Sequence, residues 1–341
     1  MDNSSQCHAS LVVTSISAPN SVMRTLAEEC STRGVTFYVI GDVPSPGDFY
    51  IDGCEFYSLN RQRETGFKLA ETLPVRHYSR KNIGYLLAIQ AKSPLILETD
   101  DDNLPSAEFW APRKLQQPIK TVRGTGWTNV YAFFSEANIW PRGLPLDAIQ
   151  VPVQKYETLP ETDACCPIQQ GLVNGDPDVD AVYRLVLPAP LPITFHEGRR
   201  VALADGAWCP FNSQNTAWYP QAYPLLYMPS YCSIRMADIW RGVVAQRIAW
   251  ENNWSVLFKS PDMYQNRNQH NLLRDFEDEI PGYLHNRAIR EALASLNLTP
   301  GTQNTGDNLI KSYEELVRLN LVGKEEIALV KAWIHDLAML S

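Results

Sequence analysis

Several common signals are missing from this sequence of 341 residues, and each absence excludes a class of protein. It has no run rich in lysine and arginine, and its formal net charge is −8, so no nucleic-acid partner is expected. No apolar stretch reaches the roughly 18 residues of a membrane-spanning helix. The first residues lack the basic and apolar regions of a signal peptide. We therefore expect a cytoplasmic protein without a transmembrane segment, and leave peripheral membrane contact and the oligomeric state open.

Cysteine and glycine are present, but not in the patterns that define common sites. The seven cysteines are scattered and include no C-x-x-C pair, which argues against a disulfide framework and against structural zinc. No G-x-G-x-x-G follows the first predicted strand, so the dinucleotide-binding fingerprint is absent. The content of 45% hydrophobic and 20% charged residues is ordinary for a globular protein.

The first hundred residues alternate predicted strands and helices. Residues 10–16 and 35–40 are apolar strands, and residues 21–33 between them carry an apolar helical stripe. A further helix begins at Arg80 and leads into residues 94–97, an apolar run too short for a helix. This order predicts an α/β fold rather than a TIM barrel, which would need eight regular units.

Three aspartates, Asp100, Asp101 and Asp102, follow the apolar run at residues 94–97. A strand without polar alternation is buried on both faces, and its carboxyl end is where open α/β sheets bind ligands. Carboxylates there repel one another unless a cation is present, and Mg²⁺ and Mn²⁺ prefer carboxylate and phosphate oxygens. We therefore predict a metal–diphosphate site. Strand alternation places Asp100 and Asp102 on one side as metal ligands, with Asp102 the principal one. Asp100 and Asp101 are also expected to lie near the ligand that carries the diphosphate.

Two further positions are candidates for binding the same ligand. Arg80 and Lys81 stand at a predicted helix start, where cations oppose the helix dipole, and such violations are typical of functional sites. Asp42 ends the second strand, where a carboxylate commonly binds a ribose or base. The simpler alternatives are a solvated helix start and a loop cap.

Several phrases, in this order, resemble the STELLO-type glycosyltransferase-like family. They are Val12-Val13-Thr14-Ser15-Ile16, Gly41-Asp42, Arg80-Lys81-Asn82-Ile83-Gly84-Tyr85, Glu98-Thr99-Asp100-Asp101-Asp102-Asn103, Ile139-Trp140-Pro141-Arg142-Gly143-Leu144-Pro145-Leu146, Asp238-Ile239-Trp240-Arg241-Gly242 and Gln265-Asn266-Arg267-Asn268. The lysine that the family often has shortly after the Gly-Asp pair is absent here. The triple aspartate and Asp176-Pro177-Asp178-Val179-Asp180-Ala181 are more distantly similar to the reversibly glycosylated polypeptides, which are UDP-arabinopyranose mutases.

The resemblance implies a GT-A fold, which is Rossmann-like, with a mixed central sheet, a nucleotide-sugar donor and a divalent ion. We expect a UDP-sugar with Mn²⁺ or Mg²⁺. The expected GT-A domain covers residues 1–297, with a nucleotide-binding half at 8–105 and an acceptor half at 106–297. Residues 298–341 are expected to form a C-terminal helical extension, a helical pair split near residue 322.

The resemblance also implies roles for individual residues. Thr14, Ser15 and Arg267 are expected to contact the donor, and His270 to be a metal ligand. Asp238, at the start of a predicted helix, is the expected catalytic base, with Arg241 one turn later to orient it. The alternatives are a structural histidine and a carboxylate placed only for the helix dipole. The acceptor-side candidates are Trp140, Arg142, Asp176, Asp178, Asp180 and Asn212, each of which could instead be a core or turn residue.

Together these features predict a metal-dependent hexosyl- or pentosyltransferase acting on a glycan or other hydroxyl acceptor, as in surface polysaccharide synthesis. An inverting enzyme would use Asp238 as base, whereas a retaining enzyme would need no side-chain base. Two alternatives stay open: a nucleotide-sugar pyranose/furanose mutase and a non-catalytic scaffold of the same fold.

Overall fold

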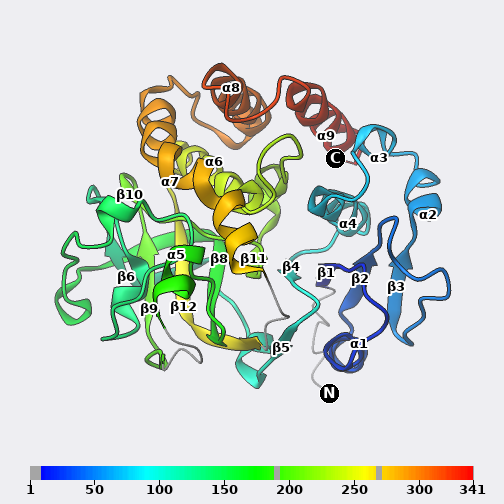
Figure 1. Cartoon of the computed structure of the whole chain (residues 1–341), viewed down its shortest axis with the longest axis horizontal. Helices are drawn as coiled ribbons and strands as arrows, with labels where there is room; N and C mark the ends of the chain where they lie inside the picture. The colour runs from blue at the N-terminus through cyan, green and yellow to red at the C-terminus, as the bar shows by residue number, and fades with distance from the viewer. Residues whose placement is uncertain (1–8, 188–192, 266–270, 341) are drawn as a thin grey trace.

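The structure is a computed structural model, and it describes residues 9–187, 193–265 and 271–340. Within these ranges, ten strands form one mixed sheet, and Figure 1 shows helices on both of its sides. The strands are β1 (Ser10–Thr14), β2 (Thr36–Ile40), β3 (Cys54–Tyr57), β4 (Ile96–Thr99), β5 (Asn103–Pro105), β6 (Gln116–Val122), β8 (Glu161–Gly175), β9 (Arg200–Leu203), β11 (Asn215–Trp218) and β12 (Trp254–Gln265). Their order is β3-β2-β1-β4-β11-β8-β6-β9-β12-β5, and β7 (Gly126–Trp127) and β10 (Ala207–Trp208) pair separately. The expected α/β class with a mixed central sheet is confirmed.

The helices flank this sheet and extend beyond it at the C-terminal end. They are α1 (Ser21–Arg33), α2 (Leu59–Arg63), α3 (Lys68–Thr72), α4 (Lys81–Gln90), α5 (Ala181–Val186), α6 (Ala237–Glu251), α7 (Leu272–Ser295), α8 (Thr305–Arg318) and α9 (Glu326–Leu340), with a short 3₁₀ turn, η1 (Tyr78–Arg80), directly before α4. None of those in the described part of the chain is both long enough and apolar enough to cross a membrane.

The first half of the sheet is parallel. β1 lies between β2 and β4, and β3 pairs with β2. Leu11 and Val13 on β1 pack in one cluster with α1, and Val12 packs on the other face with α4. α4 comes close because Gly84 has no side chain; a Cβ there would lie 2.4 Å from Cγ1 of Val12. Since these strands run in one direction, their carboxyl ends meet at one edge of the sheet.

The second half of the sheet brings further strand ends to that edge. β11 is antiparallel to β4, β8 is antiparallel to β11, and β12 is parallel to β8. The amino end of β11 and the carboxyl ends of β8 and β12 therefore lie where β4 ends. A register shift between Lys259 and Met263 lets β12 continue to Gln265, which therefore lies at this edge.

The helical pair expected at the C-terminal end is present as α8 and α9. α9 contacts α3 and α4, next to which it lies in Figure 1. The Asp336 carboxylate accepts the backbone N–H groups of Lys68 and Leu69 at 3.0 and 2.8 Å, and so caps α3, which has no side-chain cap at its own N-cap position, Phe67. Trp333 of α9 is fully buried. The division of the chain at residue 298 stays a prediction.

Candidate functional site

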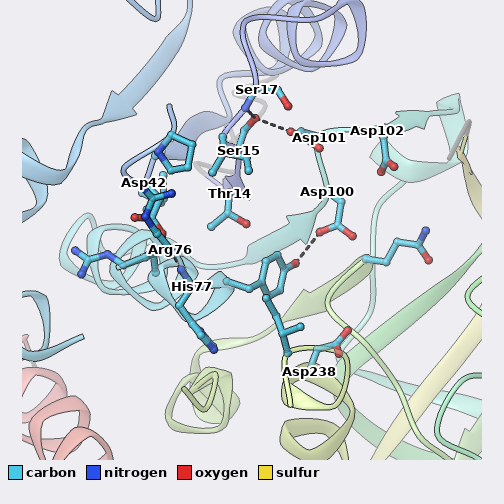
Figure 2. Close-up of a pocket in the computed structure, with 18 of the residues that line it drawn as sticks. Thr14, Ser15, Ser17, Asp42, Arg76, His77, Asp100, Asp101, Asp102 and Asp238 are labelled. Carbon is cyan, nitrogen blue, oxygen red and sulfur yellow. Dashed lines mark hydrogen bonds between the residues drawn. The ribbon is translucent and has the colours of Figure 1, made fainter. Parts of the chain in front are cut away.

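A cavity of about 710 Å³ lies where these strand ends meet (Figure 2). Its volume is in the range of about 300–1,000 Å³ that is typical of small-molecule sites. The lining comes from the ends of β1, β2, β4 and β12, from η1 and from the start of α6. The sequence-predicted residues in it are Thr14, Ser15, Asp42, Arg80, Asp100, Asp101, Asp102, Arg142, Asp178 and Asp238.

Asp100, which lines this cavity, is contacted by a tyrosine and a lysine. Tyr78 Oη donates a hydrogen bond to its Oδ1 at 2.6 Å, and Lys81 Nζ lies 3.4 Å from the same oxygen. Burial raises the pKa of Asp100, and the charges of Asp101 and Asp238 raise it further, whereas Lys81 and Tyr78 oppose the rise. Protein charges alone therefore leave this carboxylate incompletely compensated.

The other two aspartates accept hydrogen bonds from side chains at the ends of neighbouring strands. Ser15 Oγ donates to Asp101 Oδ2 at 2.5 Å, and Gln265 Nε2 donates to Asp102 Oδ2 at 3.0 Å. Figure 2 shows Asp101 turned toward Ser15, away from Asp100 and Asp102. Contrary to the expected strand alternation, the three aspartates do not continue β4 as an extended strand but lie in a turn, in which the Asn103 N–H donates to the Asp100 carbonyl oxygen at 3.4 Å.

The opposite wall is built on one arginine shared by two carboxylates. Arg142 donates to both oxygens of Asp178 at 2.8 and 2.9 Å, and to both oxygens of Asp238 at 3.0 and 2.9 Å. Asn212 Nδ2 adds a hydrogen bond to Asp178 at 2.6 Å. Burial would raise the pKa of Asp178, but the charge and hydrogen bonds of Arg142 outweigh it and hold that pKa well below its usual range. This wall fixes Asp238 in the first turn of α6.

Arg241, which was expected to orient Asp238, forms its ion pair elsewhere. Its guanidinium donates to both carboxylate oxygens of Glu98 at 2.8 and 3.0 Å. Trp218 Nε1 donates to Glu98 at 2.8 Å, and Tyr85 Oη also donates to it. Glu98 is fully buried on β4, the strand that directly precedes the three aspartates. Arg241 therefore holds this strand in place through Glu98.

Two donor-side candidates line the cavity but are also engaged with the protein. Asp42 accepts the backbone N–H groups of Val43 and His77 at 2.7 and 2.8 Å, which fixes the chain before η1. Arg80 donates twice to Gln62 Oε1, at 2.8 and 2.6 Å. Both residues therefore shape the wall of the cavity, whatever they contribute to a ligand.

Four acceptor-side candidates lie outside the cavity lining, namely Trp140, Asp176, Asp180 and Asn212, and the last of these donates to Asp178 as described above. Trp140 Nε1 donates to Asp180 Oδ2 at 2.6 Å, and Asp180 caps α5 by accepting the N–H of Tyr183 at 2.7 Å. Burial raises the pKa of Asp180 to about 6. Asp176 pairs with Arg184 at 2.8 Å. These contacts fix residues 176–184, the segment that contains Asp178.

Arg267 and His270 lie outside the described residues, so the remaining donor set decides whether a metal fits. Within the described ranges, no three histidine, cysteine, aspartate or glutamate side chains gather as a ready metal site. Mg²⁺, however, usually binds one or two carboxylates and completes its shell with phosphate oxygens and water. Asp100 and Asp102 offer such carboxylates, and the buried Thr14 Oγ1 in the same cavity has no hydrogen-bond partner among the described residues. The residues present fit a metal held jointly with phosphate.

The cavity also contains residues that the sequence did not single out. Tyr78, Gln214 and Gln265 line it, and Gln214 Nε2 donates to Gln265 Oε1 at 2.8 Å, which extends the support of Asp102. Tyr78 stands two residues before Arg80, and Gln265 opens the last family-like phrase, so both lie beside usable signals. Arg76 lines the cavity with a left-handed backbone, at φ 56°, and carries no recognisable sequence pattern.

Comparison with known proteins first indicates the class of protein to which this chain is similar. Two curated relatives from Arabidopsis thaliana are both named probable glycosyltransferases. STELLO2 is 29% identical over 339 residues, covering 90% of this chain and 42% of the relative. STELLO1 is 31% identical over 278 residues, covering 75% and 35%. The chain thus spans less than half the length of either relative.

The particular family follows from a second match. Residues 235–341, from just before α6 to the end of α9, match the model of the STELLO glycosyltransferases. Together with the two relatives, this match confirms the resemblance of the chain to the STELLO-type family. The matched segment includes Asp238 as well as the C-terminal helices.

Proposed function

We propose that this protein is a metal-dependent glycosyltransferase of the GT-A fold that transfers a hexosyl or pentosyl group from a UDP-sugar to a carbohydrate hydroxyl. The charge of the cavity wall is the observation that carries the proposal. Among the residues that the structure describes, carboxylates outnumber guanidinium groups in this lining: Asp42, Asp100, Asp101, Asp102, Asp178 and Asp238 stand against Arg76, Arg80, Arg142 and Arg235. A diphosphate would be repelled from such a wall unless a divalent cation accompanied it.

In this proposal, Asp100 and Asp102 hold Mn²⁺ or Mg²⁺ together with the donor diphosphate. When bound, the ion supplies Lewis-acid stabilisation of the departing nucleotide. Ser15 keeps Asp101 turned aside, and the unpartnered hydroxyl of Thr14 supplies a hydrogen bond to the donor. Arg267 and His270, outside the described residues, remain proposed contacts of the diphosphate and the metal.

Asp238 is the proposed acceptor-side group. Figure 2 shows it across the cavity from the aspartates, and Arg142 fixes both of its oxygens. In an inverting transfer, its carboxylate accepts the proton of the attacking hydroxyl. In a retaining transfer, it faces the anomeric region instead. A glycan such as a growing surface polysaccharide fits as the acceptor.

The proposal is tested by thermal unfolding with UDP or UDP-sugars, with and without Mn²⁺. We expect the largest rise in Tm when nucleotide and metal are both present. Asp102→Ala should abolish that rise, whereas Asp205→Ala, an exposed carboxylate outside the cavity, should keep it. The proposal fails if UDP with Mn²⁺ leaves the Tm of the unmodified protein unchanged, which is the result expected of a non-catalytic scaffold.

A second arm separates transfer from isomerisation. The protein is incubated with metal and a UDP-sugar, but with no acceptor, and the ring forms of the sugar are followed by chromatography. We expect the donor to keep its ring form. Interconversion of pyranose and furanose forms without an acceptor would replace the transferase proposal by the mutase.

A further inference from the structure

Lys81 contacts the acidic site, by which we mean Asp100, Asp101 and Asp102 at the end of β4. Oxygen atoms surround its ammonium group. The side chain is fully buried. Nζ lies 2.8 Å from Tyr78 Oη, 2.9 Å from the carbonyl oxygen of Thr99 and 3.2 Å from that of Ser213. The fourth contact is Asp100 Oδ1 at 3.4 Å. Hydroxyl, carbonyl and carboxylate oxygens are also what a hard metal cation selects.

The position of this lysine is unfavourable without those contacts. Lys81 is the first residue of α4, where a positive charge opposes the helix dipole, and the helix has no side-chain cap. A buried ammonium is costly unless it is hydrogen-bonded and paired with an opposite charge. Asp100 is the one carboxylate among its four contacts. The acidic site and the buried lysine therefore stabilise each other.

The same ammonium joins the segments that form the cavity. Tyr78 belongs to η1, Thr99 ends β4, and Ser213 precedes β11. Tyr78 Oη lies 2.8 Å from Ser213 Oγ, and the Ser213 N–H donates to Asp238 at 3.4 Å. A cation at this point thus connects the aspartate wall to the wall that carries Asp238.

We propose that Lys81 is a built-in cation of the acidic site, and not a ligand of the donor phosphates. Its ammonium partly compensates the charge of Asp100 in the absence of metal, and so acts on metal binding through that carboxylate. Lys81 is accordingly a positioning residue. The part of this inference that concerns the metal rests on the proposed function, whereas the compensation of Asp100 does not.

The proposal predicts that removing the ammonium group of Lys81 strengthens the binding of Mn²⁺. Removing the ammonium takes a positive charge away from the metal position, so Mn²⁺ should bind Lys81→Met more tightly than the unmodified protein. A purely structural role predicts the reverse, because a loosened Asp100 would bind metal more weakly. A role as phosphate ligand predicts weaker UDP binding with no gain in Mn²⁺ affinity.

In the test, each variant is titrated with Mn²⁺ without nucleotide, and the concentration of free Mn²⁺ is measured by electron paramagnetic resonance. Thermal unfolding is measured on the same variants. For Lys81→Met we expect a lower Tm without metal, a Kd for Mn²⁺ lower by about tenfold, and a larger rise in Tm on adding Mn²⁺. Lys331→Met, an exposed lysine of α9, should behave like the unmodified protein. Unchanged or weaker Mn²⁺ binding in Lys81→Met would overturn the proposal.

A double variant keeps the test decisive if Lys81→Met is too unstable to titrate. Lys81→Met/Asp100→Asn removes both charges, and we expect it to have a higher Tm than Lys81→Met alone. A double variant no more stable than the single one contradicts the compensation of Asp100. If the unmodified protein binds no Mn²⁺, the proposed function loses its metal, while this comparison of Tm values still judges the role of Lys81.

Discussion

The two walls of the cavity hold their carboxylates in different ways. At the end of β4, Asp101 and Asp102 accept hydrogen bonds from a hydroxyl and an amide, and Asp100 has a lysine at 3.4 Å. Across the cavity, Asp178 and Asp238 share four short hydrogen bonds from Arg142. The carboxylates of the second wall are thus held by one shared guanidinium, whereas those of the first wall accept hydrogen bonds from separate residues. In the proposed function, the wall with Asp100, Asp101 and Asp102 is the donor wall, and the wall with Asp178 and Asp238 is the acceptor wall.

The strongest test of the contrast is Arg142→Met. It leaves Asp178 and Asp238 buried without their shared cation, and breaking a buried pair in this way costs about 3–5 kcal/mol. The free energy of unfolding, measured in urea, should fall by that amount. The matched control is Arg287→Met, because Arg287 pairs with Asp147 at 2.7 Å and both side chains are exposed. The free energy of unfolding of this control should fall by about 1 kcal/mol or less. Equal losses in the two variants would remove the distinction between the walls.

A smaller effect is expected at Asp180, a buried carboxylate whose hydrogen bonds come from Trp140 Nε1 and the Tyr183 N–H. Burial raises the pKa of Asp180 to about 6, above its ordinary value near 3.8. The stability that its protonated form contributes is therefore present below about pH 4 and lost as the pH rises through 6.

Asp180→Asn should remove this dependence, because asparagine does not ionise, although its one side-chain oxygen cannot replace both carboxylate oxygens that accept from Tyr183 and Trp140. The lost hydrogen bond costs the variant a constant amount, whereas its free energy of unfolding relative to the unmodified protein should rise by an amount on the order of 2 kcal/mol between pH 4 and pH 7.5. Urea unfolding across this range measures it, with Asp307→Asn, an exposed carboxylate, as control. A difference that does not change with pH would show that Asp180 is ionised throughout.

The sequence predicted the donor wall far better than the acceptor wall, for a physical reason. Strands 10–14 and 96–99, the capped helix at 21–33 and the carboxylates after β4 are local patterns of periodicity and capping. Asn20 accepts the N–H of Met23, and Gly34 takes the left-handed conformation, as such patterns require.

The acceptor wall depends on contacts that no local pattern contains. Arg142 meets Asp178 and Asp238 across 36 and 96 residues, and its role depends on where β8 and α6 place them. Arg241 illustrates the limit: one helical turn from Asp238 it suggested a local partner, yet its charge pairs with Glu98, 143 residues away. Long-range pairing of buried charges is set by the tertiary fold and stays hidden in a single sequence.

The smallest decrease in the free energy of unfolding is expected for Ser15→Ala, on the donor wall. This change removes the hydroxyl that donates to Asp101 at 2.5 Å. Because Asp101 lies at an open cavity, water can replace the lost donor, and the cost should be about 1 kcal/mol in the free energy of unfolding. The neighbouring Ser17→Ala, at an exposed serine, serves as control and should be close to neutral. A loss as large as that of Arg142→Met would mean that the donor wall is as tightly organised as the acceptor wall, and that its negative charge is not held ready for a cation.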